Sequence, residues 1–348
     1  MKSIYNIWVF IVCLTLASCY EEDPITPTDS GNTGRFEFPQ GDNSWDDDIY
    51  DIYNKFGVRL IYKDITEKEF TKSWTSGSGG MGIALHGTGS YSNEMTQFYV
   101  TFMKDHIFQY LNPQITEKVF PMYWYLTFDF YGAYSWMPTL WNPLKSHSDL
   151  GFLDAWLTCF WGQHVNFMVF DDTGNLNPLE QWQSPISGNK ESYSIRRFLI
   201  INDVIEGAIE RGNIVMPEEF DTGFDHTTKL VTNDFPEDKL DPNYYIARGY
   251  PGNINTSSAK YSKPVGTYPS SAEKTFLGYV QILMRLNAEE RESTFSLSNY
   301  PFAKEKFDFV RKYMRDKYNI DTEAIANGPE NWDITPYPEL PAIIVPEM

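Results

Sequence analysis

Histidine and serine side chains are the residues whose spacing could place a metal ion or a nucleophile in this chain. The five histidines are His86, His106, His147, His164 and His226, and no two of them lie three to five residues apart. A zinc site on one helix needs two imidazoles about one turn apart. No local metal site is therefore indicated, and each histidine is expected at the surface or at the edge of the core. The G-x-S-x-G turn that presents the nucleophile of many serine hydrolases does not occur either.

A dense group of aromatic residues lies between Tyr123 and Trp161 and could form a ligand-binding surface. Packing in the core accounts for many of these rings, because large aromatic side chains dominate buried area. The stretch 132–143 is interrupted by Gly and Pro, so we expect a loop that cannot bury every ring. Exposed rings stack on sugars or hold peptide side chains. Tyr134, Trp136 and Trp141 are therefore the predicted ligand-binding residues, with core packing as the competing interpretation.

The N-terminal segment combines Lys2, an apolar run from Ile7 to Ala17 and the sequence Leu16-Ala17-Ser18-Cys19. The run is too short for a membrane span and predicts a secretory signal peptide over residues 1–18. Its end resembles the bacterial lipobox, in which a peptidase cuts before the cysteine and the thiol then carries diacylglycerol. We therefore predict lipidation at Cys19. Acyl chains contribute about 0.8 kcal/mol per buried CH₂, so several of them anchor a domain without a membrane-spanning helix.

An acidic, flexible tether is predicted over residues 19–44. Glu21, Glu22 and Asp23 directly follow the predicted anchor, and this cluster resembles the surface-export signal of Bacteroidetes lipoproteins. The resemblance implies a protein held in the cell outer membrane with its domain facing the extracellular side. The whole chain carries 28 Lys and Arg against 47 Asp and Glu, a net charge of −19. Nucleic acid is not an expected partner, because phosphate binding needs a basic face.

The remaining residues, 45–348, are expected to form a single domain of the α+β class. A hydrophobic content of 42% is enough for a large core. Apolar spacing and turn residues predict helices over 45–56, 93–110, 191–211, 271–292 and 303–318, and strands over 58–62, 121–130 and 165–170. Loops are predicted over 73–92 and 217–269, and the length of the second indicates a functional or mobile segment. Cys159 lies in an apolar run and is expected to be a core residue.

Several short stretches occur in the order typical of one bacterial family. They are Tyr53–Tyr62, the apolar strands before the helix predicted at 191–211, Pro217–Phe220 and Lys312–Asp321. With this order, residues 45–329 resemble the zinc-binding metallopeptidase lipoproteins of Bacteroidetes, which are often encoded beside SusC/SusD-type nutrient importers. The resemblance implies a zincin-like fold. In zincins, an H-E-x-x-H helix holds Zn²⁺ with two histidines, and its glutamate takes a proton from the metal-bound water.

The zinc ligands of this family are replaced in the present sequence. The resemblance aligns Asn202-Asp203-Val204-Ile205-Glu206 with the H-E-x-x-H helix, and it aligns Gly278 with an acidic third ligand. Two carboxylates without histidine, Asp203 and Glu206, suit Ca²⁺ or Mg²⁺ better than Zn²⁺, but those ions need more oxygen ligands than the local sequence offers. The resemblance therefore implies a degenerate active-site helix, no bound metal and no cofactor.

Together these expectations favour a catalytically inactive accessory subunit of a SusC/SusD-type nutrient uptake system. Such a subunit would bind a peptide, a glycan or the transporter itself, and its acidic surface would favour cationic or neutral ligands. Two alternatives remain open. One is an active zinc-dependent metallopeptidase whose atypical ligands come from distant segments, and the other is a purely structural subunit of the transporter complex.

Overall fold

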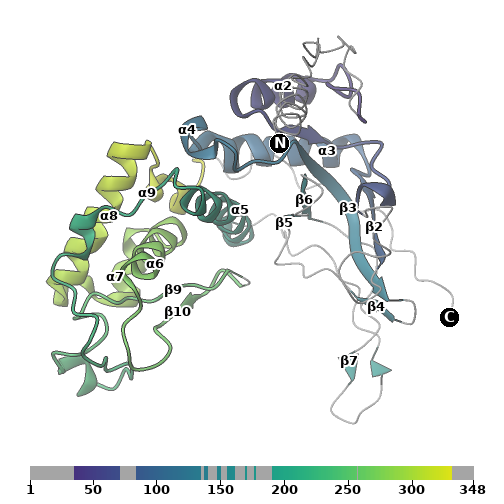
Figure 1. The fold of residues 1–348 in the computed structure, drawn as a ribbon. Helices are drawn as coiled ribbons and strands as arrows, with labels where there is room; N and C mark the ends of the chain where they lie inside the picture. Colours follow the sequence, from purple (N-terminus) through teal and green to yellow (C-terminus); the bar gives the residue numbers. More distant parts are fainter. Residues whose placement is uncertain are drawn as a thin grey trace, which may run out of the picture. The chain divides into compact units, whose positions relative to one another are not determined.

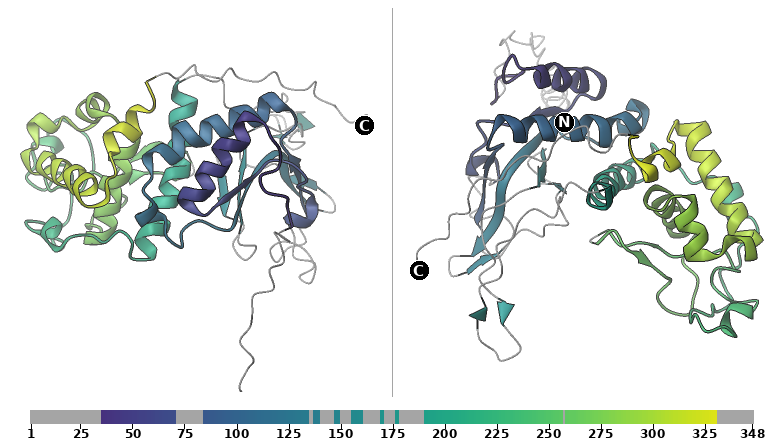
Figure 2. Two further views of the ribbon diagram at one scale, coloured as in Figure 1. Left: turned by 90° about the horizontal axis from the view of Figure 1, so that it is seen from above. Right: turned by 180° about the vertical axis from the view of Figure 1, so that it is seen from behind.

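The computed structural model describes residues 35–70, 84–134, 137–139, 147–149, 155–160, 169–170, 176–177, 190–256 and 258–330 (Figures 1 and 2). The chain divides into two units, Met1–Glu37 and Phe38–Met348, and the helices and strands of the described residues lie in the second. The predicted signal peptide, Cys19 and the first part of the predicted tether lie outside the described residues. Among the described helices, none is both long and apolar enough to cross a lipid bilayer.

Helix α2, Ser44–Phe56, begins and ends where the sequence predicts. At its start, Asp46 Oδ2 accepts a hydrogen bond from the Asn43 backbone N–H at 2.9 Å, as in a capping box. At its end, Gly57 adopts the left-handed conformation with φ of 76°, which glycine reaches without steric cost. Strand β1, Arg59–Ile61, follows directly. The predicted helix and strand at the start of the domain are confirmed.

A six-stranded mixed sheet forms around β3, Tyr123–Tyr134. Strands β1 and β6 (Ala155–Cys159) flank β3 in parallel, and this register pairs Trp124 with Trp156. Three further strands are antiparallel to their partners: β2 (Ala84–Gly89) and β4 (Met137–Thr139) pair with β3, and β5 (His147–Asp149) pairs with β6. Both tryptophan rings are buried and meet edge to face at 5.1 Å. The central strand predicted at 121–130 is confirmed and is longer than expected.

Two segments that the sequence predicts as loops contain strands. The predicted loop 73–92 includes β2, and the predicted loop 132–143 includes the end of β3 and all of β4. Gly and Ser indicated a loop at 73–92, and Gly and Pro indicated one at 132–143, but strand pairing with β3 holds β2 and β4 extended. Gly89 lets the end of β2 lie close to the residue after β1, because a Cβ at position 89 would overlap the Tyr62 backbone carbonyl. Sheet pairing has therefore overridden the local turn signals.

Helices and two short hairpins complete the described elements. The range predicted as one helix, 93–110, is helical throughout: α3 (Asn93–Phe102) continues through a π-helical turn (Met103–Ile107) and a 3₁₀ turn (Phe108–Tyr110). The other helices are α4 (Pro113–Thr116), α5 (Lys190–Glu210), α6 (Ala272–Arg285), α7 (Ala288–Phe295), α8 (Pro301–Tyr318) and α9 (Thr322–Asn327). The hairpins pair β7 (Val169–Phe170) with β8 (Leu176–Asn177) and β9 (Asn253–Ile254) with β10 (Tyr261–Ser262). The central helix predicted at 191–211 and the helix predicted at 303–318 are confirmed.

The single helix predicted over 271–292 is wrong, because the structure has two helices there. Leu286 is extended, with φ of −109° and ψ of 127°, and it separates α6 from α7. The Asn287 side chain then accepts a hydrogen bond from Glu290 N, while the Glu290 carboxylate accepts one from Asn287 N. This reciprocal cap starts a new helix and stops the old one.

Helix α6 lies between α5 and α8, and the β9–β10 hairpin lies alongside it (Figures 1 and 2). Its buried face includes Phe276, Tyr279, Val280 and Leu283.

Cys159 is also buried, as expected, and its Sγ accepts a hydrogen bond from Phe130 N. Helices and a mixed sheet within one compact unit make the fold α+β.

Lys306 places a buried ammonium group among aromatic rings in the helical part. Its side chain on α8 is 4% exposed, and Nζ donates hydrogen bonds to Phe220 O at 2.8 Å and Thr222 O at 2.7 Å. The same nitrogen lies 5.1 Å from the ring centroids of Phe224 and Phe302. Burial lowers the pKa of Lys306. Two carbonyl acceptors and the ring faces together offset the cost of burying the charge.

Replacing Lys306 with methionine should lower the free energy of unfolding by about 2 to 3 kcal/mol, since it leaves two buried carbonyls without their donor and removes the cation–π contacts. Urea denaturation measures the change. Lys304→Met is the matched control on the same helix, because that side chain is exposed and its ion pair with Asp308 contributes little. Equal midpoint shifts for the two variants would contradict this account of Lys306.

Candidate functional site

The positions that the resemblance aligns with the zincin motif, 202–206, lie in α5, which packs against α6. Asn202 is fully buried, whereas Asp203 and Glu206 are half-buried. The apolar stripe of α5, which includes Phe198, Ile201 and Ile205, faces the core and fixes the rotation of the helix. The predicted helix therefore presents Asn202 and Glu206, which are four residues apart, along the neighbouring helix.

Gln281 joins these two residues across the α5–α6 interface. Its Nε2 donates hydrogen bonds to Asn202 Oδ1 at 3.1 Å and to Glu206 Oε1 at 3.0 Å. The Gln281 side chain is 3% exposed, and Asn202 Nδ2 is buried without a hydrogen-bond partner among the described residues. A neutral amide thus occupies the space between the positions that align with the two zinc-binding histidines.

Gly278 lies on α6 where the chain leading into β9 crosses the helix. A Cβ at position 278 would overlap the Gly252 carbonyl oxygen far inside van der Waals contact. Gly252 itself has φ of 91°, and a Cβ there would overlap the Ser262 carbonyl oxygen. Two glycines therefore allow α6, the segment before β9 and β10 to approach one another closely.

A groove of about 480 Å³ opens beside this crossing. It is lined by Glu206 of α5, by residues of α6 that include Gln281, and by the β9–β10 hairpin. Most of the lining side chains are polar: Asn253, Asn255, Thr256, Ser262, Lys263, Ser270, Lys274 and Thr275. Small-molecule sites have volumes of about 300 to 1,000 Å³, so the groove is large enough for a ligand.

Charged side chains occur at both ends of the groove. Glu206 lies at the Gln281 end, and Lys274 lies seven residues earlier on α6, near its start. Lys263 also lines the groove, but its Nζ is bound to Asp234 Oδ2 at 3.0 Å and to Thr232 O at 2.9 Å. Its charge is therefore largely compensated within the protein.

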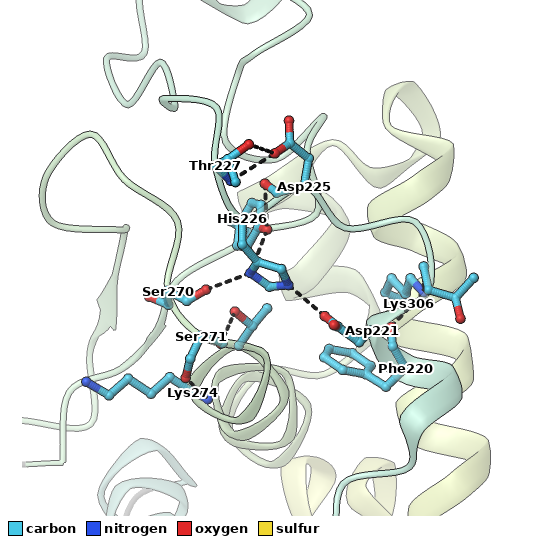
Figure 3. Close-up of polar contacts among 12 residues, drawn as sticks. Phe220, Asp221, Asp225, His226, Thr227, Ser270, Ser271, Lys274 and Lys306 are labelled. Carbon is cyan, nitrogen blue, oxygen red and sulfur yellow. Dashed lines mark hydrogen bonds and ion pairs between the residues drawn. The ribbon is translucent and has the colours of Figure 1, made fainter.

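A histidine cluster adjoins the Lys274 end of the groove (Figure 3). His226 Nε2 lies 2.7 Å from Asp221 Oδ1, and Nδ1 lies 3.1 Å from Ser270 O. Tyr250 O–H, which donates to Asp225 O, lies 3.2 Å from the same Nδ1. Burial raises the pKa of Tyr250 to about 12, so this hydroxyl stays protonated at neutral pH. The cluster ties the loop after α5 to the loop before α6.

Asp225 closes a small turn next to this cluster. Its Oδ1 accepts hydrogen bonds from Thr227 N, Thr227 Oγ1 and Thr228 N at 2.7 to 3.1 Å. Hydrogen bonds from Thr228 and Thr227 hold the pKa of Asp225 well below its usual range. Oδ2 lies 3.0 Å from Arg248 Nη2. Every one of these contacts satisfies groups of the protein itself, so we assign the turn a structural role.

The described histidines are placed differently from one another. His226 is partly exposed at the edge of the core, as expected, and His86 is half-buried. His106 contradicts the expectation, because it is only 6% exposed and stacks on Phe102 at 4.5 Å. The neutral imidazole of His106 is buried among aromatic and apolar side chains. The side chains of His147 and His164 lie outside the described residues.

The donor set around 202–206 does not fit the zinc ion that the resemblance implies. The segment 202–206 contains no histidine, and Gln281 Nε2 directs N–H groups toward Asn202 Oδ1 and Glu206 Oε1 instead of leaving their lone pairs to a metal. Position 278 has no room for a carboxylate. Within the described ranges, no group of three or more His, Cys, Asp or Glu side chains could hold a metal ion.

The predicted ligand-binding aromatics are only partly located. Tyr134 is the last residue of β3, but its side chain lies outside the described residues, as do Trp136 and Trp141 entirely. The groove was not predicted as a site, although the predicted functional or mobile loop at 217–269 supplies its β9–β10 wall. No local pattern marks Gln281, whose partners lie 75 and 79 residues away in the sequence.

Comparisons with protein-family models, with curated protein sequences and with solved structures return no match to this chain.

Proposed function

We propose that this chain is a zincin-like lipoprotein that binds a ligand and does not cleave it, as a surface-exposed accessory subunit of a SusC/SusD-type nutrient uptake system. The observation that carries the proposal is the Gln281 amide, which bridges Asn202 and Glu206 where a zincin would hold its metal. Beside this bridge, the groove offers space for a peptide or glycan.

Hydrolysis by a zincin needs a metal-bound water and a carboxylate free to take its proton. By the resemblance, Asn202 and Glu206 stand at the two histidine positions and Asp203 stands at the position of the base. Asn202 and Glu206 both accept hydrogen bonds from Gln281, and neither supplies an imidazole to hold the metal. The Gly278–Gly252 crossing supports the same proposal, because backbone occupies the place of a third ligand. All three positions that the resemblance aligns with metal ligands are replaced, so one compensating change would not restore the metal site.

The cellular part of the proposal rests on the N-terminal sequence. Leu16-Ala17-Ser18-Cys19 supports a lipid anchor, and the acids after Cys19 support export to the extracellular side of the cell outer membrane. The tether over 19–44 would let an anchored domain reach a transporter in the same membrane. Peptide or glycan captured in the groove would then be close to the importer.

Metal analysis combined with a hydrolysis assay tests the non-catalytic assignment. We expect the purified chain, after dialysis against zinc at neutral pH, to retain far less than one zinc per molecule and to leave a mixed peptide library intact. A chelator should change neither result. Stoichiometric zinc together with peptide cleavage that a chelator abolishes would establish the rival assignment, an active zinc-dependent metallopeptidase with atypical ligands.

A further inference from the structure

The groove beside α5 and α6 has opposite charges at its two ends. Glu206 is held at one end by Gln281, and Lys274 precedes Gln281 by seven residues on α6. Seven residues are two helical turns, which place Lys274 and Gln281 on one face of α6 and about 10 Å apart along its axis. Glu206 on α5 meets the Gln281 end of this face through its hydrogen bond with Gln281. Among the described residues, neither Glu206 nor Lys274 forms an ion pair within 4.0 Å. These two charges are therefore available to a ligand.

The electrostatics of α6 add to the positive end. Lys274 lies in the first turn of this fourteen-residue helix, whose N-terminus carries the positive end of the helix dipole. Its side chain extends away from the His226 cluster (Figure 3), so it does not serve the carboxylates of that cluster. A ligand carboxylate at this end would meet an ammonium group and the helix dipole together.

Between the two ends, the lining suits a peptide backbone. Asn253 and Thr256 are exposed, and their amide and hydroxyl groups can exchange hydrogen bonds with peptide N–H and C=O groups. Leu277 and Val265 supply apolar contact, and Val265 is 94% exposed. Among the described residues of the lining, the one aromatic ring is that of Tyr250, which is 3% exposed and offers no face for a sugar to stack on.

We propose that the groove binds short free peptides as zwitterions, with the terminal ammonium at Glu206 and the terminal carboxylate at Lys274. An extended chain rises about 3.3 to 3.6 Å per residue, so a span of about 10 Å fits three or four residues. This inference rests on the proposed function and names the ligand class for it. A neutral glycan would cover both charged groups without bringing an opposite charge to either of them, which is unfavourable.

Isothermal titration calorimetry with capped and uncapped tripeptides tests the proposal. The probes are Ala-Ala-Ala and Ala-Phe-Ala, each with free termini, with an N-acetyl group or with a C-terminal amide. We expect each cap to weaken binding about tenfold, since it removes one charged contact. In Glu206→Gln, which keeps an acceptor for Gln281, peptides with and without the N-acetyl group should bind with the same affinity. In Lys274→Gln, peptides with a C-terminal amide and with a free C-terminal carboxylate should bind with the same affinity.

Lys260→Gln is the matched control, because Lys260 is exposed between β9 and β10 but does not line the groove. This variant should respond to both caps as the parent does. The zwitterion proposal would be overturned if Glu206→Gln did not remove the effect of the acetyl group, or if Lys274→Gln did not remove the effect of the amide. The absence of any tripeptide binding would overturn it as well. Binding of maltotriose or cellotriose that ignores both substitutions would also overturn it, yet would leave a non-catalytic binding subunit intact. Chelator-sensitive cleavage of the tripeptides would instead overturn the proposed function itself.

Discussion

Replacing Gly278 with alanine is expected to lower the free energy of unfolding by about 3 to 5 kcal/mol. The added methyl group would overlap the Gly252 carbonyl oxygen, which belongs to backbone and cannot rotate away as a side chain does. Gly252 cannot retreat easily, because it has a positive φ and lies against the Ser262 carbonyl. Overpacking alone costs about 1 to 3 kcal/mol, and separation of α6 from β9 adds lost burial. Urea denaturation followed by circular dichroism measures the loss.

Gly207→Ala is the matched control for this substitution. Gly207 is also a helical glycine, but its Cβ would meet the Val119 side chain at 3.0 Å, whereas a Cβ at Gly278 would lie 2.3 Å from a backbone oxygen. A displacement of Val119 by a few tenths of an ångström would relieve the contact at Gly207. Removing a glycine from a helix gains up to about 1 kcal/mol, so this variant should stay within about 1 kcal/mol of the parent. If Gly278→Ala were as stable as Gly207→Ala, the close crossing of α6 by the Gly252 segment would be contradicted.

Acidification should destabilise the fold through His106, at about 1.4 kcal/mol per pH unit below about pH 6.5. His106 lies in the core, and Arg197 Nη1 is 3.2 Å from its Nδ1. Burial and, secondly, the Arg197 charge lower the pKa of His106 from 6.5 to about 3. The folded state therefore binds no proton there between pH 6.5 and 3, whereas the unfolded chain does. Stability consequently rises with pH across this window and is lost as the pH falls.

Unfolding free energies measured at pH 7, 6 and 5 test this dependence. His106 alone should account for a loss of about 2 kcal/mol between pH 6.5 and 5. His106→Gln keeps an oxygen acceptor for Arg197 but cannot titrate, so its unfolding free energy should fall less steeply with acid. His226→Gln is the control, since that side chain is 32% exposed and lies outside the core. A His106→Gln variant with the slope of the parent would refute the burial of a neutral imidazole.

The elements that the sequence predicts best are those with strong local signals. Helix α2 has a cap at Asn43 and a stop at Gly57, and α5 and α8 have wide apolar stripes. Their ends and faces depend on residues close together in the chain. The zincin-like arrangement is a different matter, since it concerns how distant elements pack, and it stays a prediction.

The elements that the sequence misses depend on distant partners. Strand β2 is extended because β3, about forty residues later, hydrogen-bonds to it, and its own glycines indicate a turn. The break between α6 and α7 had a local signal, Asn287 followed by Glu290, but the apolar period continued across it. A capping box that interrupts a helical pattern should therefore take precedence over the pattern.

In the candidate site too, positions on one helix could be predicted from the sequence, whereas contacts between distant segments could not. Asn202 and Glu206 could be placed on one helix face from their spacing. Gln281 could not be predicted, because its contacts come from α6, and neither could the need for glycine at both 252 and 278. A glycine in a helix is a weak clue that another backbone passes close by.

Arg197 links regions that leave the ribosome far apart in time. Its Nε donates to Ile325 O at 2.6 Å and its Nη2 to Ala326 O at 3.0 Å, both on α9. Until α9 is synthesised, the guanidinium group lacks these two acceptors, and burying it without them is costly. The core around α5 is therefore completed only after about 128 further residues have been made.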